Sequence, residues 1–506
     1  MVSSSDKTIA KNTIFLSLRM VFVLFVSLYT SRVFLRVLGV EDFGINNVVC
    51  GFVALFSFIN TSMANGIQRF YNYEGEKNGV SGRVCVFNTA LLIQGILALI
   101  IFLLLETVGI WCVSHKMVIP PERLHAALWV YHFSVASAII VILQAPFTAM
   151  VMAYEKMNYF ALVGVVDVLL KLILAYILVY SPIDKLIFYG FVLLLISILV
   201  FLMYFIYCCR NFDAVKVERC FSWSILKKML RFSGWGLLGT FACVTREQGL
   251  NIVLNLFFGP IVNAARGIAY QVSSALQGFV TSISVASKPQ MVSSYANGDS
   301  QRTIGLMFSM SKLSFGVLLL MAIPICVEIG FVLRVWLGDV VPEHSSSFVI
   351  LIILTNFINN LNAPLSNVVY ATGKMKEYEI VFSMINLLII PISIITLKSG
   401  LAPESVFIVY FIMTIFVQVG CLWALNKIIS INIREYIVQL IVPLLLCSIL
   451  CFPLPFLLSR VMEAGWLRFI TVTIVSALTS SILFYRIVLN STERKLVVKF
   501  IKNRLP

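Results

Sequence analysis

The chain has 506 residues, of which 60% are hydrophobic and 12% are charged. A soluble domain is typically about 25% charged, so this composition, with a mean hydropathy of +0.97, excludes a soluble protein. The formal net charge of +15 does not indicate a nucleic-acid partner, because Lys and Arg of membrane proteins gather in cytoplasmic loops. We therefore predict an all-α polytopic membrane protein that binds no nucleic acid.

Apolar runs recur along almost the whole chain, with short polar gaps between them. A helix needs about 20 mostly apolar residues to cross a bilayer. We predict about fourteen such helices, near residues 12–34, 44–65, 85–109, 127–149, 160–180, 186–207, 232–258, 261–285, 306–333, 346–371, 379–397, 403–425, 437–458 and 466–489. Twelve helices are the alternative, because any even number of helices places both termini on the same side of the membrane. The first run resembles a signal peptide, but it is too long and contains Arg19, so we expect it to be retained.

Lys and Arg fall unequally on the alternate segments that link the predicted helices. If the N-terminus is cytoplasmic, the inner segments hold most of them, with dense groups in residues 208–231 and after Tyr485. Basic residues mark cytoplasmic loops, so both termini are predicted to be cytoplasmic. The basic segment after Tyr485 also suits contact with anionic membrane lipids.

A shift of 220 residues sets Gly39 against Gly259, and each glycine lies between an apolar helix and a helix with scattered polar residues. The shift spans six predicted helices, so the two halves would share one membrane orientation, as in transporters whose site lies between repeats. We predict a six-helix bundle in 1–207, a cytoplasmic linker in 208–231, a second six-helix bundle in 232–425, and an added helix pair with a basic tail in 426–506.

One predicted helix carries a polar stripe. Residues stepping by three or four lie on one side of a helix, and here they are Asn263, Arg266, Tyr270, Ser273, Gln277, Thr281, Ser284 and Lys288. An Asp, Lys or Arg at the centre of a membrane helix costs at least ~2.5–3.5 kcal/mol, so the stripe is expected to face a water-filled cavity. Hydrogen bonds across a dry helix interface are the alternative.

The preceding helix presents Arg246, Glu247, Asn251 and Asn255, and the first helix presents Arg19. If the halves are repeats, these two helices correspond, and both offer cations and amides to one central space. A structural ion pair between Arg246 and Glu247 is the alternative. Five asparagines in a later helix are suited to hydroxyl-rich ligands or to bonds between helices, and they are Asn356, Asn359, Asn360, Asn362 and Asn367.

Asp167 and Lys171 are four residues apart in the fifth predicted helix. This spacing allows a salt bridge on one helix face, and we favour that structural role. A paired carboxylate inside a membrane is also a candidate proton or sodium site. Asp167, Lys171 and Glu247 are therefore the candidate ion-coupling residues.

The chain contains no motif of a known catalytic or metal site. A GxxxxGK[ST] loop, a GxSxG elbow and an HExxH pair are all missing, and no histidine has metal-ligand spacing. Most of the eleven cysteines lie in apolar runs and are interpreted as small reduced core residues. We expect no enzyme activity, no cofactor and no metal, with H⁺ or Na⁺ coupling as an open alternative.

The segment from Asn12 through the turn Leu38-Gly39-Val40-Glu41-Asp42-Phe43-Gly44, followed by 65–70 (Asn-Gly-Ile-Gln-Arg-Phe), resembles polysaccharide flippases of the multidrug/oligosaccharidyl-lipid/polysaccharide exporter superfamily. It is most similar to bacterial O-antigen and capsule repeat-unit flippases. The LGxxxFG turn is moderately specific, and the helix number and two-half layout extend the resemblance over the whole chain.

This resemblance implies two six-helix bundles around a central cavity and an extra C-terminal helix pair. It also implies a bacterial inner membrane and, as substrate, an oligosaccharide on undecaprenyl pyrophosphate that is moved to the periplasmic leaflet by alternating access. Polysaccharide assembly proteins are expected partners. The cavity residues would be Arg19, Arg246, Glu247, Asn251, Asn255, Arg266, Tyr270, Ser273 and Gln277. A multidrug antiporter of the same superfamily and a membrane-embedded glycan polymerase are the alternatives.

Overall fold

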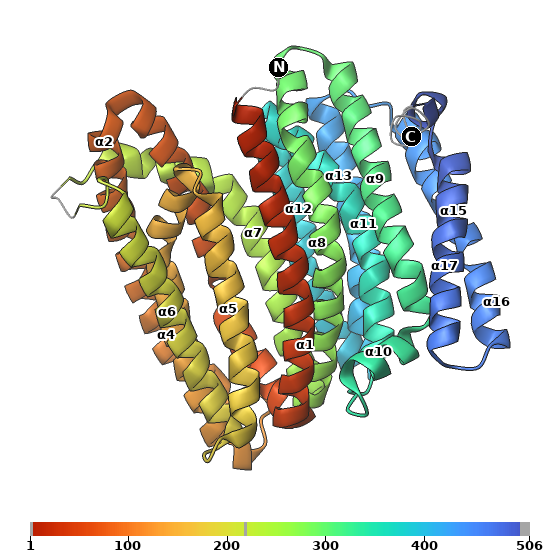
Figure 1. Ribbon diagram of the computed structural model, residues 1–506, viewed down its shortest axis with the longest axis horizontal. Helices are drawn as coiled ribbons and strands as arrows, with labels where there is room; N and C mark the ends of the chain where they lie inside the picture. Colours follow the sequence, from red (N-terminus) through yellow and green to blue (C-terminus); the bar gives the residue numbers. More distant parts are fainter. Residues whose placement is uncertain (1–3, 217–219, 496–506) are drawn as a thin grey trace. The chain divides into compact units, whose positions relative to one another are not determined.

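The computed structural model describes residues 4–216 and 220–495, in which every regular element is a helix (Figure 1). Eleven helical stretches in this part of the chain are long and apolar enough to cross a membrane. The chain is therefore an all-α polytopic membrane protein, as predicted from its composition. The helix number of about fourteen stays a prediction, because long helices at two predicted spans, 232–258 and 261–285, are not among these eleven.

The first two helices are long and each contains one break at a glycine. In α1 (Ser4–Ala54) the break is Gly39, with φ 82°, and in α2 (Ser57–Leu104) it is Gly79, with φ 60°. Positive φ angles suit glycine because it has no Cβ. Gly39 thus divides the first predicted span from the second, and the second continues past a two-residue turn at Leu55 and Phe56.

The remaining helices follow the predicted runs closely. The N-terminal part continues with η1 (Leu105–Gly109), α3 (Ile110–His115), η2 (Pro121–Arg123), α4 (Leu124–Ala153), α5 (Met157–Ile177), η3 (Leu178–Tyr180) and α6 (Lys185–Asn211). The middle of the chain forms α7 (Trp223–Phe258), α8 (Pro260–Ala296), α9 (Ser300–Val327), α10 (Ile329–Leu337), α11 (Ser345–Thr372), α12 (Lys376–Lys398) and α13 (Glu404–Ile428). The C-terminal part forms α14 (Ile433–Tyr436), η4 (Ile437–Ile441), α15 (Val442–Cys451), α16 (Pro453–Val461), α17 (Trp466–Leu483) and η5 (Phe484–Val488).

The contacts group these helices into two compact units. Unit 1 contains the chain up to Gly267 together with Asn386–Val406, and unit 2 contains Ile268–Ile385 and the chain from Phe407 onward. In unit 1, α2 packs against α4 and α7, and α1 packs against α5. In unit 2, α9 packs against α11 and α17. The division into two repeated bundles stays a prediction, because a grouping by contacts does not test a repeat.

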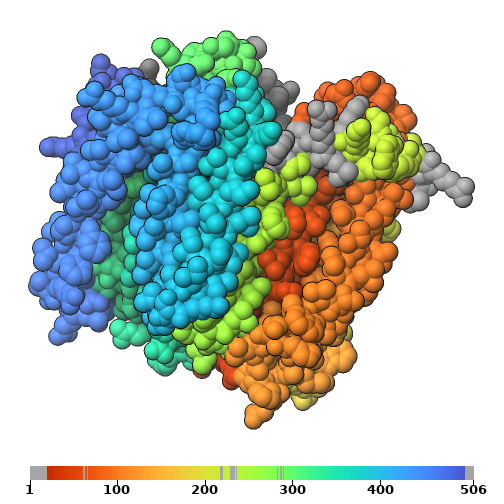
Figure 2. Space-filling model, turned by 180° about the vertical axis from the view of Figure 1, so that it is seen from behind, coloured from red at the N-terminus to blue at the C-terminus, as the bar shows by residue number. Residues whose placement is uncertain are grey.

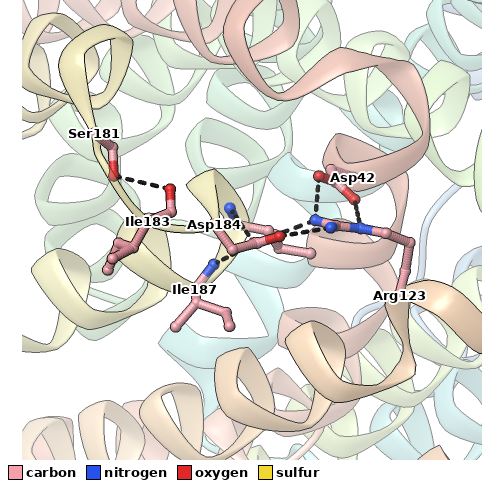
Figure 3. Close-up of polar contacts among 7 residues, drawn as sticks. Asp42, Arg123, Ser181, Ile183, Asp184 and Ile187 are labelled. Atoms are coloured by element: carbon pink, nitrogen blue, oxygen red, sulfur yellow. Dashed lines mark hydrogen bonds and ion pairs between the residues drawn. The ribbon is translucent and has the colours of Figure 1, made fainter.

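An ion triad joins three helices at one end of unit 1. The Arg123 guanidinium donates through Nε to Asp42 of α1 at 2.7 Å and through Nη1 to Asp184 at 2.6 Å (Figure 3). Asp184 also caps α6, because its Oδ1 accepts from the amides of Leu186 and Ile187. Burial raises the pKa of the Asp184 carboxyl, but hydrogen bonds from Arg123 and these amides outweigh it, so the pKa lies below its usual value.

We expect Arg123→Gln to lower the stability of the detergent-solubilised protein by about 2 kcal/mol, because charge-assisted hydrogen bonds to two partly buried carboxylates are lost. The measurement is the thermal unfolding midpoint. A carboxyl whose folded pKa is depressed stabilises the fold above its unfolded pKa of about 4 and loses that contribution as the pH falls through the folded pKa. The difference between variant and parent should therefore shrink at acidic pH.

Lys185→Gln is the matched control for this variant, because Lys185 is an exposed cation next to Asp184. It should leave the unfolding midpoint nearly unchanged. An Arg123→Gln midpoint equal to that of the control would show that the triad does not hold α1, η2 and α6 together.

Candidate functional site

Two arginines from neighbouring helices lie buried in unit 1, on either side of Glu247. Arg246 of α7 is 6% exposed, and Arg266 of α8 is 4% exposed. Nη2 of Arg246 lies 3.4 Å from the Glu247 carboxylate, and Nη2 of Arg266 donates to the Glu247 main-chain carbonyl. The ion pair between Arg246 and Glu247 that the sequence left open is thus present, and it is long.

Arg246 has a second partner that the sequence analysis did not single out. Its Nη1 donates to the side-chain carbonyl of Asn386, a residue of α12 that is 1% exposed. No spacing pattern could have pointed to this contact, because the two residues are 140 positions apart. The only sequence signal was an amide within an apolar run.

Glu247 contacts both arginines in the described part of the chain. Its carboxylate faces Arg246, its main-chain carbonyl accepts from Arg266, and its side chain is 42% exposed. Figure 2 shows that one face of unit 1 is hollowed between the orange helices and the yellow-green α7, where red residues from early in the chain lie deeper. Helix α7 carries both Arg246 and Glu247. We interpret the two neighbouring buried guanidinium groups as a candidate site for an anion.

The neighbouring asparagines of unit 1 bind other helices. The Asn251 amide donates to the main-chain carbonyl of Asn47 in α1 at 3.0 Å, and Asn263 donates to the side-chain oxygen of Asn251 at 2.8 Å. A Cβ on Gly51 would lie 2.4 Å from the Asn251 side chain, so α1 approaches α7 closely here. Asn251 and Asn263 are fully buried, which is the arrangement of the dry-interface alternative.

Asn255 connects α7 to the chain segment before α4. Its side-chain oxygen accepts from the Val118 amide at 2.9 Å, and its nitrogen donates to the Val118 carbonyl at 3.2 Å. Asn255 is fully buried. In this conformation, Asn251 and Asn255 tie helices together and offer no polar surface to a ligand.

The rest of the predicted stripe belongs to unit 2. Ser273 of α8 is buried and accepts a hydrogen bond from Asn356 of α11 at 2.8 Å. Tyr270 and Gln277 are half-buried on the same helix. A further amide of α11, Asn359, donates to the Tyr410 hydroxyl at 3.2 Å. Contacts of this kind hold helices together inside a membrane.

Three other predicted residues differ in how far the structure describes them. Lys171 donates to Asp167 at 2.8 Å along α5, and both side chains are partly exposed, so the local ion pair predicted from their spacing is present. The backbone of Arg19 belongs to α1, but its side chain lies outside the described residues. In the part of the chain that is described, no group of three or more His, Cys, Asp and Glu could hold a metal ion.

We expect Asn255→Ala to destabilise the protein by about 2 kcal/mol, because both backbone groups of Val118 lose a buried partner. The measurement is the unfolding midpoint in detergent. Leu256→Ala is the control, since it truncates the next, exposed residue of α7 and should have a small effect. Equal midpoints for the two variants would contradict a structural role of Asn255.

Comparisons with known proteins agree with this architecture. Residues 9–294 match the family described as polysaccharide biosynthesis protein. No curated protein matches the chain at a significant level.

Three solved structures share its fold at low sequence identity. The lipid II flippase MurJ, in an inward closed conformation, has a TM-score of 0.70 and 15% identity, covering 94% of this chain and 99% of that chain. An inward-facing multidrug resistance MATE family transporter of the MOP superfamily has a TM-score of 0.67 and 16% identity, covering 82% and 98%. A MOP superfamily transporter from Pyrococcus furiosus has a TM-score of 0.60 and 17% identity, covering 83% and 95%.

Identities this low establish a common fold and no more. The family match is stronger, because it covers more than half of the 506 residues and includes α7 and most of α8. The chain therefore belongs to the polysaccharide biosynthesis protein family, and it has the fold of MOP-superfamily transporters.

Proposed function

We propose that this protein is a flippase that moves an undecaprenyl-pyrophosphate-linked oligosaccharide repeat unit from the cytoplasmic to the periplasmic leaflet of a bacterial inner membrane. The observation that carries the proposal is the pair of buried arginines, Arg246 and Arg266, which share one acidic partner residue. Family membership and the fold shared with a lipid II flippase support it.

The chemistry of the proposed head group fits two buried guanidinium groups. A diphosphate brings negative charge into a region of low dielectric constant, where that charge needs cationic hydrogen-bond donors. Guanidinium matches phosphate oxygens in a bidentate geometry. Placing an arginine in a membrane-spanning helix costs free energy, so such a residue usually marks a functional site. The prenyl chain needs no polar site, because it can stay in the lipid.

The contacts suggest how an anion would enter this group. Glu247 is half-exposed and its carboxylate lies 3.4 Å from Arg246, so it is the partner that a phosphate can displace most easily. Asn386 would continue to orient the guanidinium from the opposite side. Glu247 then acts as an internal counter-ion that occupies Arg246 when the site is empty.

The proposal includes alternating access between two six-helix halves, with both termini in the cytoplasm. The excess of Lys and Arg on the side of the termini supports this orientation. Membrane lipids and other polysaccharide assembly proteins are the proposed partners. The protein is proposed to be a transporter without enzyme activity, cofactor or metal.

We expect Arg266→Ala to leave the protein in the membrane and to stop surface polysaccharide assembly, and Arg246→Ala to have the same effect. Each variant removes one of the two proposed phosphate-binding cations. The measurement is the amount of surface polysaccharide in cells whose only copy of the gene encodes the variant. The amount of variant protein in the membrane is measured in the same cells. Arg334→Ala is the control, because it removes an exposed arginine of α10.

Normal assembly in the Arg266→Ala strain would remove that residue from the site. Loss of the protein from the membrane would be a folding defect. In that event Arg266→Lys, which keeps the charge and loses the fork geometry, should retain part of the activity if the charge is what the substrate needs.

The roles of Asp167 and Lys171 can be separated by one pair of variants. Asp167→Asn alone leaves Lys171 without its partner at 2.8 Å, whereas Asp167→Asn with Lys171→Gln removes both charges. If the pair is structural, we expect the double variant to regain the stability and transport that the single variant loses. If it is an ion-coupling site, transport should stay low in the double variant although its stability recovers.

A multidrug antiporter is the second candidate, because a MATE family transporter has the same fold. An antiporter of organic cations would favour an anionic site, whereas the described group around Glu247 has more cations than anions. Drug susceptibility of cells with and without the protein distinguishes the two. A glycan polymerase would instead change the lipid-linked sugar chemically when purified protein is incubated with it.

A further inference from the structure

Unit 2 contains a cavity of about 650 Å³ that the flippase proposal does not use. Its walls come from the beginning of α9, the link from α13 to α14 and η4, and the residues that follow η5. The side chains that matter here are Arg302, Ser309, Lys312, Glu435, Gln439 and Glu493. This volume is within the range of small-molecule binding sites.

An ion pair between Lys312 and Glu493 lines the deep part of the cavity. Lys312 has a side chain that is 5% exposed, and its Nζ donates to Glu493 Oε2 at 3.0 Å. The Ser309 hydroxyl donates to Oε1 of Glu493 at 3.0 Å, and the main-chain amide of Asn490 donates to Oε2 at 2.9 Å. The residues after η5 are thereby bound to α9, and this part of the cavity is preformed.

The outer part of the cavity carries two charges of opposite sign. Arg302, in the first turn of α9, and Glu435, in α14, are both exposed. Glu435 accepts a hydrogen bond from Gln439 at 2.8 Å. Since Lys312 and Glu493 neutralise one another, the four charged residues that line the cavity sum to zero.

Apolar side chains form another part of the wall. Ile304 and Phe308 of α9 and Ile431 line the cavity beside these charges, and the Phe308 ring packs against Tyr436 at 5.7 Å. Most of the lining residues come from the ends of membrane-spanning helices (Figure 1), whereas Ser309 and Lys312 lie further along α9. Helix ends lie where hydrocarbon meets the head-group region, so the cavity combines polar and apolar surfaces at the depth of lipid head groups.

We propose that this cavity binds the zwitterionic head group of a membrane phospholipid of the phosphoethanolamine type. The phosphate lies at Arg302, the ammonium lies at Glu435, and the upper part of an acyl chain lies against Ile304, Phe308 and Ile431. A zwitterion matches charged groups that sum to zero, whereas an anionic head group would offer no cation to the Glu435 carboxylate. The inference does not depend on the flippase proposal.

The test is native mass spectrometry of the full chain released from nanodiscs that contain equal amounts of phosphatidylethanolamine and phosphatidylglycerol. We expect the parent protein to retain phosphatidylethanolamine preferentially. The double variant Arg302→Gln with Glu435→Gln should retain about tenfold less, because each change removes a charge-assisted contact. Both side chains are exposed, so the variant should fold, and its unfolding midpoint checks this. If the double variant unfolds, Arg302→Gln alone replaces it in the same measurement and should also retain less phosphatidylethanolamine than the parent.

Lys374→Gln with Glu377→Gln is the matched control, because it removes one cation and one anion from exposed positions of unit 2 that do not line the cavity. It should retain the lipid like the parent. Equal retention in the cavity variant and the control would overturn the proposal, as would equal retention of phosphatidylglycerol by the parent. Displacement of the lipid by an equal concentration of soluble phosphoethanolamine would overturn its assignment to a membrane lipid.

Discussion

An ionised side chain in a membrane-spanning helix must find its partner within the protein, because hydrocarbon offers neither water nor counter-ions. Two buried ion pairs of unit 2 follow this constraint. Lys312 is paired with Glu493, and Glu328 at the end of α9 is paired with Arg468 of α17 at 2.7 Å. These two ion pairs attach the C-terminal helices of unit 2 to the middle and to the C-terminal end of α9.

The same constraint applies to the buried side chains of Arg246 and Arg266. Their described partners include one carboxylate at 3.4 Å, one side-chain amide and one main-chain carbonyl, and the Nε atoms of both arginines are buried without a hydrogen-bond partner among the described residues. A group of this kind can accept an anion without first breaking a strong buried salt bridge. The nearby asparagines are different, because their hydrogen-bonding groups are used in contacts between helices.

The two polar regions of the protein are proposed to bind different ligands. The two buried arginines of unit 1 suit a diphosphate, because guanidinium groups bind phosphate oxygens. The cavity of unit 2 is electrically neutral and partly apolar, which suits a lipid that stays in its own leaflet. A transporter that works in a membrane needs both kinds of contact, one with the molecule it moves and one with the lipid that surrounds it.

The amino-acid sequence by itself determined the class of fold, the approximate helix bounds, the break at Gly39 and the local pair of Asp167 with Lys171. These features depend on hydropathy and on spacing within a few residues, which are properties of the local chain. The sequence also drew attention to the polar residues of α7 and α8, but their spacing could not say which of them bind a neighbouring helix.

Only the tertiary structure decided that Asn251 and Asn255 hold α1 and the Val118 segment, and that Arg246 contacts Asn386 from 140 positions away. It also decided that residues from three distant segments enclose one cavity in unit 2. A polar stripe has the same spacing whether it faces water or another helix. What it faces is set by the packing of helices that are remote in the chain, and that packing is not encoded in any single helix.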